Sequence, residues 1–243
     1  MRVCEYEDSR SYRAKTNIFP TTEILIIVIV VAFMFGVFYL LNGEKTTIDS
    51  SKEYVVEINT KDTYQNQLNS IIKQLCPAED NLNELDKYKL LHDFVAQAIT
   101  YEFSALRPGV NLAYGQGYND PAQALNTGKG VCGSYAQLYK DLCDRADLTC
   151  EVAQGYAFIP GNTSSLGHAW NLVKVGTQWY HLDCCWSDTG GGLYEYYMRG
   201  ENFIQVGDGG NFREMYTPKI TISKTDYKID RNEQYNRIVI RRK

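Results

Sequence analysis

The sequence lacks features that mark several common function classes. It has no basic excess, because 25 lysines and arginines stand against 29 aspartates and glutamates, for a formal net charge of −4. This balance gives no broad basic surface for nucleic acid, and the Arg-Arg-Lys end at 241–243 is interpreted as a solvated terminus. There is also no internal repeat of the kind that builds solenoids. We therefore expect one main domain that binds no nucleic acid.

Metal-binding and cofactor-binding patterns are missing as well. Seven cysteines are present, but none form a C-x-x-C pair or a regular disulfide framework, and several are interpreted as small core residues. Zinc sites need clustered ligands at short spacings, and no two cysteine or histidine residues have finger-type spacing. No aspartate-rich calcium loop occurs, and the glycine run 190–192 lacks the strand, helix and lysine of a phosphate loop. We expect no metal and no cofactor.

One long apolar run is present at residues 24–41, ILIIVIVVAFMFGVFYLL, without a charge. As a helix it would be about 27 Å long, enough to span a bilayer core. A buried core helix would need a polar face, and a cleaved signal peptide would be shorter and followed by an A-x-A site. We interpret the run as an uncleaved anchor. Basic residues are more frequent before it than after it, which predicts a cytoplasmic N-terminus: Arg2, Arg10, Arg13 and Lys15, against Lys45 and Lys52.

The chain divides into five predicted parts. They are a cytoplasmic tail (1–21), a transmembrane anchor (22–42), a linker with an accessory strand and helix (43–81), a core (82–203) and a C-terminal extension of mainly strands (204–243). The protein is thus predicted to be a single-pass protein of the cell membrane, with its core outside the cytoplasm.

The hydrophobic pattern changes period along the core. A strand is predicted at 53–58, helices at 62–75 and 84–100, a short helix after Asp120-Pro121, and a helix that begins at Cys132. Strands follow at 150–158, 168–175 and 178–183, the last two joined by a hairpin near Gly176. Helices before strands indicate an α+β fold. His92 lies off the apolar stripe of its helix and is predicted to be a surface residue without a role.

Three residues form a candidate catalytic set: Cys132 at a helix start, His168 at the start of a strand, and Asp183 at the end of the next strand. A hairpin centred on residues 176–177 places Asp183 opposite Trp170 and diagonal to His168, whereas one centred on 175–176 places Asp183 directly opposite His168. Either register allows a bond between the imidazole and the carboxylate.

The chemistry of acyl transfer needs these residue types. A helix N-terminus and an imidazolium both lower the pKa of a thiol, and a carboxylate orients and stabilises the imidazolium. The resulting thiolate attacks a carbonyl, and the N–H of Cys132 can stabilise the oxyanion. For the second oxyanion donor, Gln116 and Gln123 remain equal candidates.

The segment GKGVCGSYAQLYKDLCDRADL resembles the cysteine segment of the transglutaminase-like superfamily, and GHAWNLVKVGTQWYHLDCCWSD resembles its histidine and aspartate segments. The stretches KLLHDFVAQAITYE and YEYYMRG are similar to the flanking segments. The resemblance covers about residues 82–200. It implies a papain-like α+β domain, with a helix-start cysteine packed on an antiparallel sheet, and the catalytic roles for Cys132, His168 and Asp183.

One departure concerns Cys184 and Cys185, where family members often have threonine or serine. They are interpreted as core substitutions, and an oxidisable pair that gates the site is the alternative. The sequence therefore predicts a membrane-anchored thiol enzyme that acts on a protein or peptide amide, by hydrolysis or by transfer to an amine. The alternative is a catalytically silent binding module that retains the fold.

Overall fold

A computed structural model describes residues 48, 52–113, 115–158, 165–189, 194–206, 213–217 and 219–243. The chain divides into two compact units, Met1–Lys45 and Thr46–Lys243, and the description below concerns the second. The predicted anchor at 22–42 and the tail before it lie outside the described residues. Among the residues that are described, no helix has the length and apolar character needed to cross a membrane.

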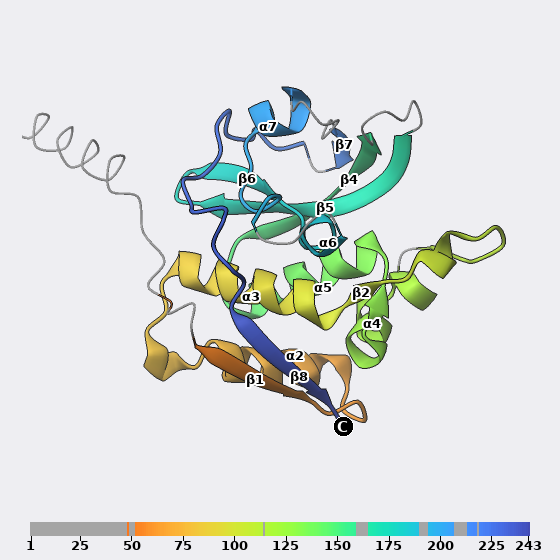
Figure 1. Cartoon of the computed structure of the whole chain (residues 1–243), viewed down its shortest axis with the longest axis vertical. Coiled ribbons are helices and arrows are strands. Elements are labelled where there is room, and N and C mark those ends of the chain that lie inside the picture. Colours follow the sequence, from red (N-terminus) through yellow and green to blue (C-terminus); the bar gives the residue numbers. More distant parts are fainter. Residues whose placement is uncertain are drawn as a thin grey trace, which may run out of the picture. The chain divides into compact units, whose positions relative to one another are not determined.

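The second unit contains both helices and strands (Figure 1). The helices are α2 (Tyr64–Leu75), α3 (Glu84–Ala98), α4 (Pro121–Thr127), α5 (Cys132–Arg145), α6 (Cys184–Thr189) and α7 (Glu201–Val206), with short 3-10 turns η1 (Ala78–Asp80), η2 (Phe103–Leu106) and η3 (Gly117–Asn119). The strands are β1 (Glu53–Ile58), β2 (Thr100–Tyr101), β3 (Lys129–Gly130), β4 (Cys150–Phe158), β5 (Ser165–Val175), β6 (Gln178–Leu182), β7 (Arg213–Thr217) and β8 (Arg237–Arg242). This arrangement confirms the predicted α+β class, and the sequence-derived helices and strands agree with it to within a few residues.

The main sheet has four antiparallel strands in the order β6-β5-β4-β7. In the hairpin, Asn171 faces Leu182 and Val175 faces Gln178, so residues 176 and 177 form the turn. Gly176 has a φ of 58°, a left-handed conformation that glycine adopts without a steric cost. Of the two registers allowed by the sequence, the structure has the one that extends to pair Trp170 with Asp183.

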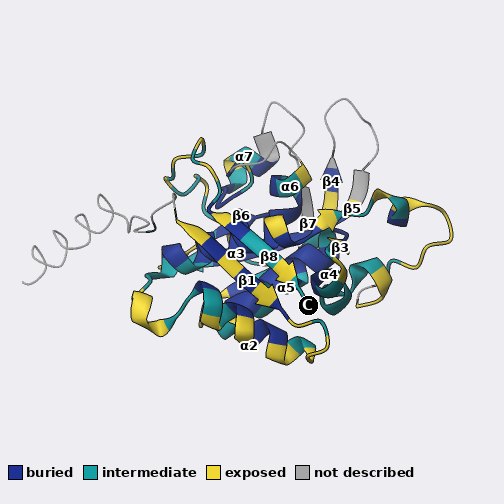
Figure 2. Ribbon diagram, turned by 60° about the horizontal axis from the view of Figure 1, so that its bottom comes forward, coloured by how far each residue is buried: buried dark blue, intermediate teal, exposed yellow. Residues whose placement is uncertain are grey.

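Helices α3 and α5 lie between this sheet and a second layer formed by α2 and the parallel pair β1–β8 (Figure 1). Most of α5 is buried, including Tyr135, Leu138, Tyr139 and Leu142 at the helical spacings of three and four (Figure 2). On the sheet side, the Asn171 amide donates to the Ala136 carbonyl at 2.9 Å. The helix that begins with Cys132 is thus fixed on both faces by the core.

The other buried helix, α3, begins with a capping box. The Asn83 side chain accepts from the backbone N–H of Asp86, and the Asp86 side chain accepts from that of Asn83. The prediction that His92 lies on the surface is wrong, because its side chain is fully buried. The residues on its side of α3 are covered by segments that follow far along the chain, near Tyr194 and Tyr235. A helical pattern read alone cannot show such a second covering layer.

Candidate active site

Cys132 occupies the first turn of α5, as predicted. Val131 is the N-cap, and Ser134 Oγ both accepts from the Val131 N–H (3.0 Å) and donates to the Val131 carbonyl (2.7 Å). These bonds fix the chain at the entry to the helix. The first N–H groups of a helix have no acceptor within it, so the N–H of Cys132 is available to a bound anion.

His168 and Asp183 are brought together by the hairpin. His168 Nε2 lies 2.7 Å from Asp183 Oδ2, and both side chains are nearly inaccessible to solvent. The other carboxylate oxygen of Asp183 accepts the backbone N–H of Trp186 at 3.0 Å. The Asp183 carboxylate is therefore held by the start of α6 while it binds the imidazole. This leaves Nδ1 of His168 for the Cys132 thiol.

Aromatic side chains enclose the imidazole. The ring of Trp170 stacks on His168, with centroids 5.9 Å apart and planes 16° apart, and Trp186 lies 5.0 Å away. Behind this stack, Trp170 Nε1 donates to His181 Nδ1 at 2.9 Å, and His181 Nε2 lies 3.5 Å from Glu201 Oε1. A polar chain from Glu201 through His181 thus sets the position of the indole against which His168 packs.

The electrostatics favour a thiolate–imidazolium pair. Burial opposes the charged form of Cys132, but a hydrogen bond and the positive charge of His168, with the backbone N–H of Ala169, outweigh it and lower the pKa of the thiol. Burial likewise opposes a charge on His168, but Asp183 and Cys132 raise its pKa to about 9. Each group stabilises the charge of the other. The contacts within the set therefore favour the charged forms of both Cys132 and His168.

A cavity of about 340 Å³ opens beside this set. It is lined by Tyr101, Leu106, Leu112, Asn119, Val131, Cys132, Gly133, Gln154, Gly167, His168 and Ala169. Gly133 has a steric role, because a Cβ at this position would overlap Asn119 Oδ1. The absence of a side chain there lets the loop before α4 approach the start of α5 and form one wall of the cavity.

Neither glutamine considered as an oxyanion donor is among the residues that line this cavity. Gln116 is exposed and its side-chain oxygen accepts from Asn111 at 2.6 Å. The two side-chain amides in the wall are Asn119 and Gln154, and Asn119 Nδ2 donates to the Leu112 carbonyl at 2.9 Å. Sequence reasoning missed Gln154 because strand alternation does not show that β4 reaches the helix start.

Cys184 and Cys185 follow Asp183 directly but are buried, and they belong to the main hydrophobic core. Burial raises the pKa of the Cys184 thiol well above its usual value. These properties favour the interpretation as core substitutions. In the part of the chain that the structure describes, no group of three or more histidine, cysteine, aspartate or glutamate side chains could hold a metal ion.

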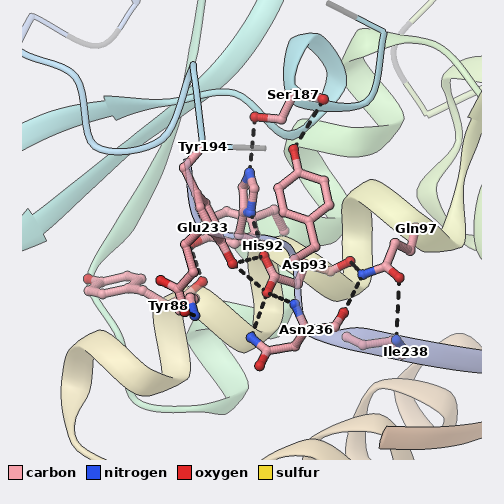
Figure 3. Close-up of polar contacts among 12 residues, drawn as sticks. Tyr88, His92, Asp93, Gln97, Ser187, Tyr194, Glu233, Asn236 and Ile238 are labelled. Carbon is pink, nitrogen blue, oxygen red and sulfur yellow. Dashed lines mark hydrogen bonds and ion pairs between the residues drawn. The ribbon is translucent and has the colours of Figure 1, made fainter. Parts of the chain in front are cut away.

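A second polar cluster is centred on His92 and Asp93 and contains none of the residues that line the cavity (Figure 3). Asp93 Oδ2 accepts from Tyr194 Oη (2.7 Å), from the Asn236 backbone N–H (2.9 Å) and from Asn236 Nδ2 (2.7 Å), while Asp93 Oδ1 lies 3.0 Å from His92 Nδ1. The opposite ring nitrogen of His92 lies 3.1 Å from Ser187 Oγ on α6. The cluster joins α3, α6 and the segment before β8, and so supports the short helix that follows Asp183.

With this geometry in view, the chain can be compared with known proteins. Residues 73–184 match the model of the transglutaminase-like superfamily, a range that includes Cys132, His168 and Asp183. The chain is 25% identical over 139 residues to Kyphoscoliosis peptidase of Mus musculus, which covers 55% of this chain and 20% of the relative. The chain thus spans about a fifth of that relative's length. The resemblance to the superfamily seen in the sequence is confirmed.

Two solved structures also resemble the fold. One is a crystal structure of a candidate cysteine protease from Cytophaga hutchinsonii, with 18% identity, a TM-score of 0.36, and coverage of 52% of this chain and 40% of the other. The second is a crystal structure of a TGase, with 19% identity, a TM-score of 0.40, and coverage of 59% and 35%.

Proposed function

Because residues 73–184 form a transglutaminase-like domain, we propose that the protein is a thiol enzyme that transfers the acyl group of an amide through Cys132, His168 and Asp183. One observation carries this proposal. A thiol at a helix start lines a cavity together with an imidazole, and a buried carboxylate lies 2.7 Å from that imidazole. These are the parts of an activated nucleophile, its general base and the group that orients the base.

The reaction would have two halves. The Cys132 thiolate attacks the amide carbonyl and a C–S bond forms, while the oxyanion lies against the Cys132 N–H. The C–N bond then breaks, and His168 gives its proton to the departing amine, which leaves a thioester. In the second half His168 takes a proton from water or from an acceptor amine, which attacks the thioester. The thiolate leaves and takes up its pairing with the imidazolium again.

Gln154 is the side-chain amide placed for the second oxyanion contact. It lines the cavity and faces Ala169, the residue after His168, across the β4–β5 ladder. Asn119 is less suited, because its Nδ2 donates to the Leu112 carbonyl. Replacement of one oxyanion donor in other enzymes costs about 10²- to 10³-fold in turnover, and we expect an effect of that order for Gln154→Ala.

Hydrolysis is the favoured outcome of the second half-reaction. The similarity to a protein named as a peptidase supports this choice. A protein or peptide is the expected substrate. The alternative function is a binding module that retains the fold without turnover, and the paired His168 and Asp183 argue against it.

The proposed location rests on the sequence. The uncharged run at 24–41 and the basic residues before it support a single-pass membrane protein with the thiol domain outside the cytoplasm. Protease added to intact cells, or to spheroplasts where an outer membrane exists, should remove a C-terminal tag and spare an N-terminal one. A protected C-terminal tag under those conditions contradicts the proposed orientation.

The proposed reaction is tested with a peptide library incubated with the full chain in H₂¹⁸O, with and without a labelled primary amine. Hydrolysis puts ¹⁸O into the new carboxylate, whereas transfer attaches the amine, and both require a thioester on Cys132 that intact-mass spectrometry can trap. Cys132→Ala serves as the matched control. Tight peptide binding without thioester, cleavage or amine incorporation would favour the binding module.

A further inference from the structure

The segment after β2 exposes large apolar side chains beside the cavity. Phe103 is 68% exposed and Leu106 is 54% exposed, and Val110 follows in the same segment. This segment reaches outward from the body of the molecule between β2 and α4 (Figure 1). Scattered exposed apolar residues are ordinary, but a group on one segment marks a contact surface. Val55, in strand β1 of the other layer, is also exposed, at 41%, but it is not among the residues that line the cavity.

The exposed group is continuous with the wall of the cavity that contains Cys132. Leu106 and Leu112 line that cavity directly. Phe103 packs on Tyr101, with ring centroids 4.8 Å apart, and Tyr101 is itself a lining residue. An apolar group bound at the cavity mouth can therefore touch Leu106 and, beside it, the Tyr101–Phe103 pair. We name this surface the apolar lip: Tyr101, Phe103, Leu106 and Leu112.

The lip side chains themselves carry no charge, and two charged residues flank them in the chain, Glu102 and the exposed Arg107. Apart from Cys132 and His168, the described residues that line the cavity are uncharged. Glu102 pairs with Lys129 at 3.1 Å and accepts the backbone N–H of Ser104 at 3.1 Å. These bonds lower the pKa of Glu102, so it stays ionised and bound to its partners. A charged substrate group that is buried against the lip side chains would lose water without gaining a partner from them.

We propose that the site selects acyl donors that carry a large apolar side chain at or next to the residue whose carbonyl is attacked. The inference rests on the proposed thiol chemistry and names the substrate class for it. Binding against Leu106 and the Tyr101–Phe103 pair removes apolar surface from water on both sides, whereas a serine or aspartate at that position gains nothing. Apolar pockets discriminate by about tenfold or more for groups of this size.

The test uses two series of probes, acetyl-X-Gly and acetyl-Gly-X fluoromethyl ketones, with X as Leu, Phe, Ser, Asp or Lys. We measure the rate at which each labels Cys132 in the full chain. In at least one series, Leu and Phe should react about tenfold faster than Ser and faster still than Asp. Phe103→Ser and Leu106→Ser, tested separately, should reduce that preference several-fold. Val55→Ser, which alters an exposed apolar residue of the β1–β8 layer, should not change it.

Iodoacetamide, which has no side chain to recognise, separates the two possible failures. Rapid alkylation of Cys132 combined with equal rates for all X in both series, or with the fastest reaction for Asp or Lys, would overturn the apolar lip and leave the thiol chemistry standing. If Cys132 reacts with iodoacetamide no faster than the other cysteines, the proposed function fails and the inference fails with it.

Discussion

His168 Nε2 and Asp183 Oδ2 lie 2.7 Å apart, although fifteen positions separate the two residues in the chain. The contact is diagonal across the β5–β6 ladder, since the register extends to pair Asp183 with Trp170. It uses one nitrogen of the imidazole for the carboxylate and leaves the other for Cys132. The two ring nitrogens thus have different partners, and the orientation of one ring connects the Asp183 carboxylate to the Cys132 thiol.

The first prediction concerns the pKa of His168. Asp183→Asn removes the carboxylate that raises this pKa to about 9 against the opposing effect of burial, so the pKa should fall. NMR titration of the imidazole resonances measures this pKa, and the chain has three histidines whose resonances must be assigned. Asp144→Asn, which alters a surface pair with Lys140, is the control. An unchanged His168 pKa in Asp183→Asn would contradict the coupling between the imidazole and the carboxylate. Turnover by this variant should fall by about 10³- to 10⁴-fold.

The same ion pair predicts a pH dependence of stability. A raised pKa in the folded state means that the stabilisation is complete below the ordinary imidazole value of 6.5 and is lost as pH rises through about 9. The difference in unfolding free energy between the parent and Asp183→Asn should therefore be larger near pH 6 than near pH 10. Urea denaturation at both pH values measures it. A larger difference at the alkaline pH contradicts the assignment.

A second substitution tests the chain of contacts behind Trp170. His181→Ala removes the acceptor of the Trp170 Nε1–H bond, and a buried donor without a partner costs about 1–3 kcal/mol. Because Trp170 stacks on His168, labelling of Cys132 should also slow. His181→Gln keeps an acceptor and should restore part of the labelling rate. If His181→Ala loses stability but labels at the parent rate, the contacts stabilise the fold without positioning His168.

Asp93 should be among the most sensitive positions for stability. Asp93→Ala leaves three buried donors, from Tyr194 and Asn236, without their acceptor, and the loss of one partner of a buried polar cluster costs about 3–5 kcal/mol. Asp144→Ala breaks an exposed pair with Lys140 and should cost less than about 1 kcal/mol. Denaturant unfolding compares them. Equal losses at the two positions would show that the cluster in Figure 3 does not hold α6 in place.

The fold and the grouping of Cys132, His168 and Asp183 were largely predictable from the sequence, because they depend on local signals. The helix start at Cys132 and the turn at Gly176 are marked by short-range residue preferences, and the hairpin then brings His168 and Asp183 together in either register. The sequence did not decide between the two registers, because a turn at 175–176 and a turn at 176–177 both allow the bond between His168 and Asp183. Only the structure shows that residues 176 and 177 form the turn.

The rest of the site depends on contacts between distant segments. His92 is buried because Tyr194 and Tyr235 cover it from positions about one hundred or more residues later, and no helical pattern contains that information. Gln154 and Leu106 reach the cavity from a strand and a 3-10 turn that the sequence does not place near Cys132. The need for glycine at position 133 is likewise visible only in the structure, where Asn119 occupies the space of a Cβ.

The most direct test of the account is the rate of iodoacetamide alkylation at each cysteine as a function of pH, with the label located by mass spectrometry in the full chain. Because His168 lowers the pKa of Cys132, Cys132 should react first, with a midpoint below the value of about 8.5 for a free thiol. His168→Ala should shift that midpoint upward, while Asp144→Asn should leave it unchanged. Two results would contradict the account: equal reactivity of Cys132 and the buried Cys184, or a Cys132 midpoint that is unchanged in a folded His168→Ala variant.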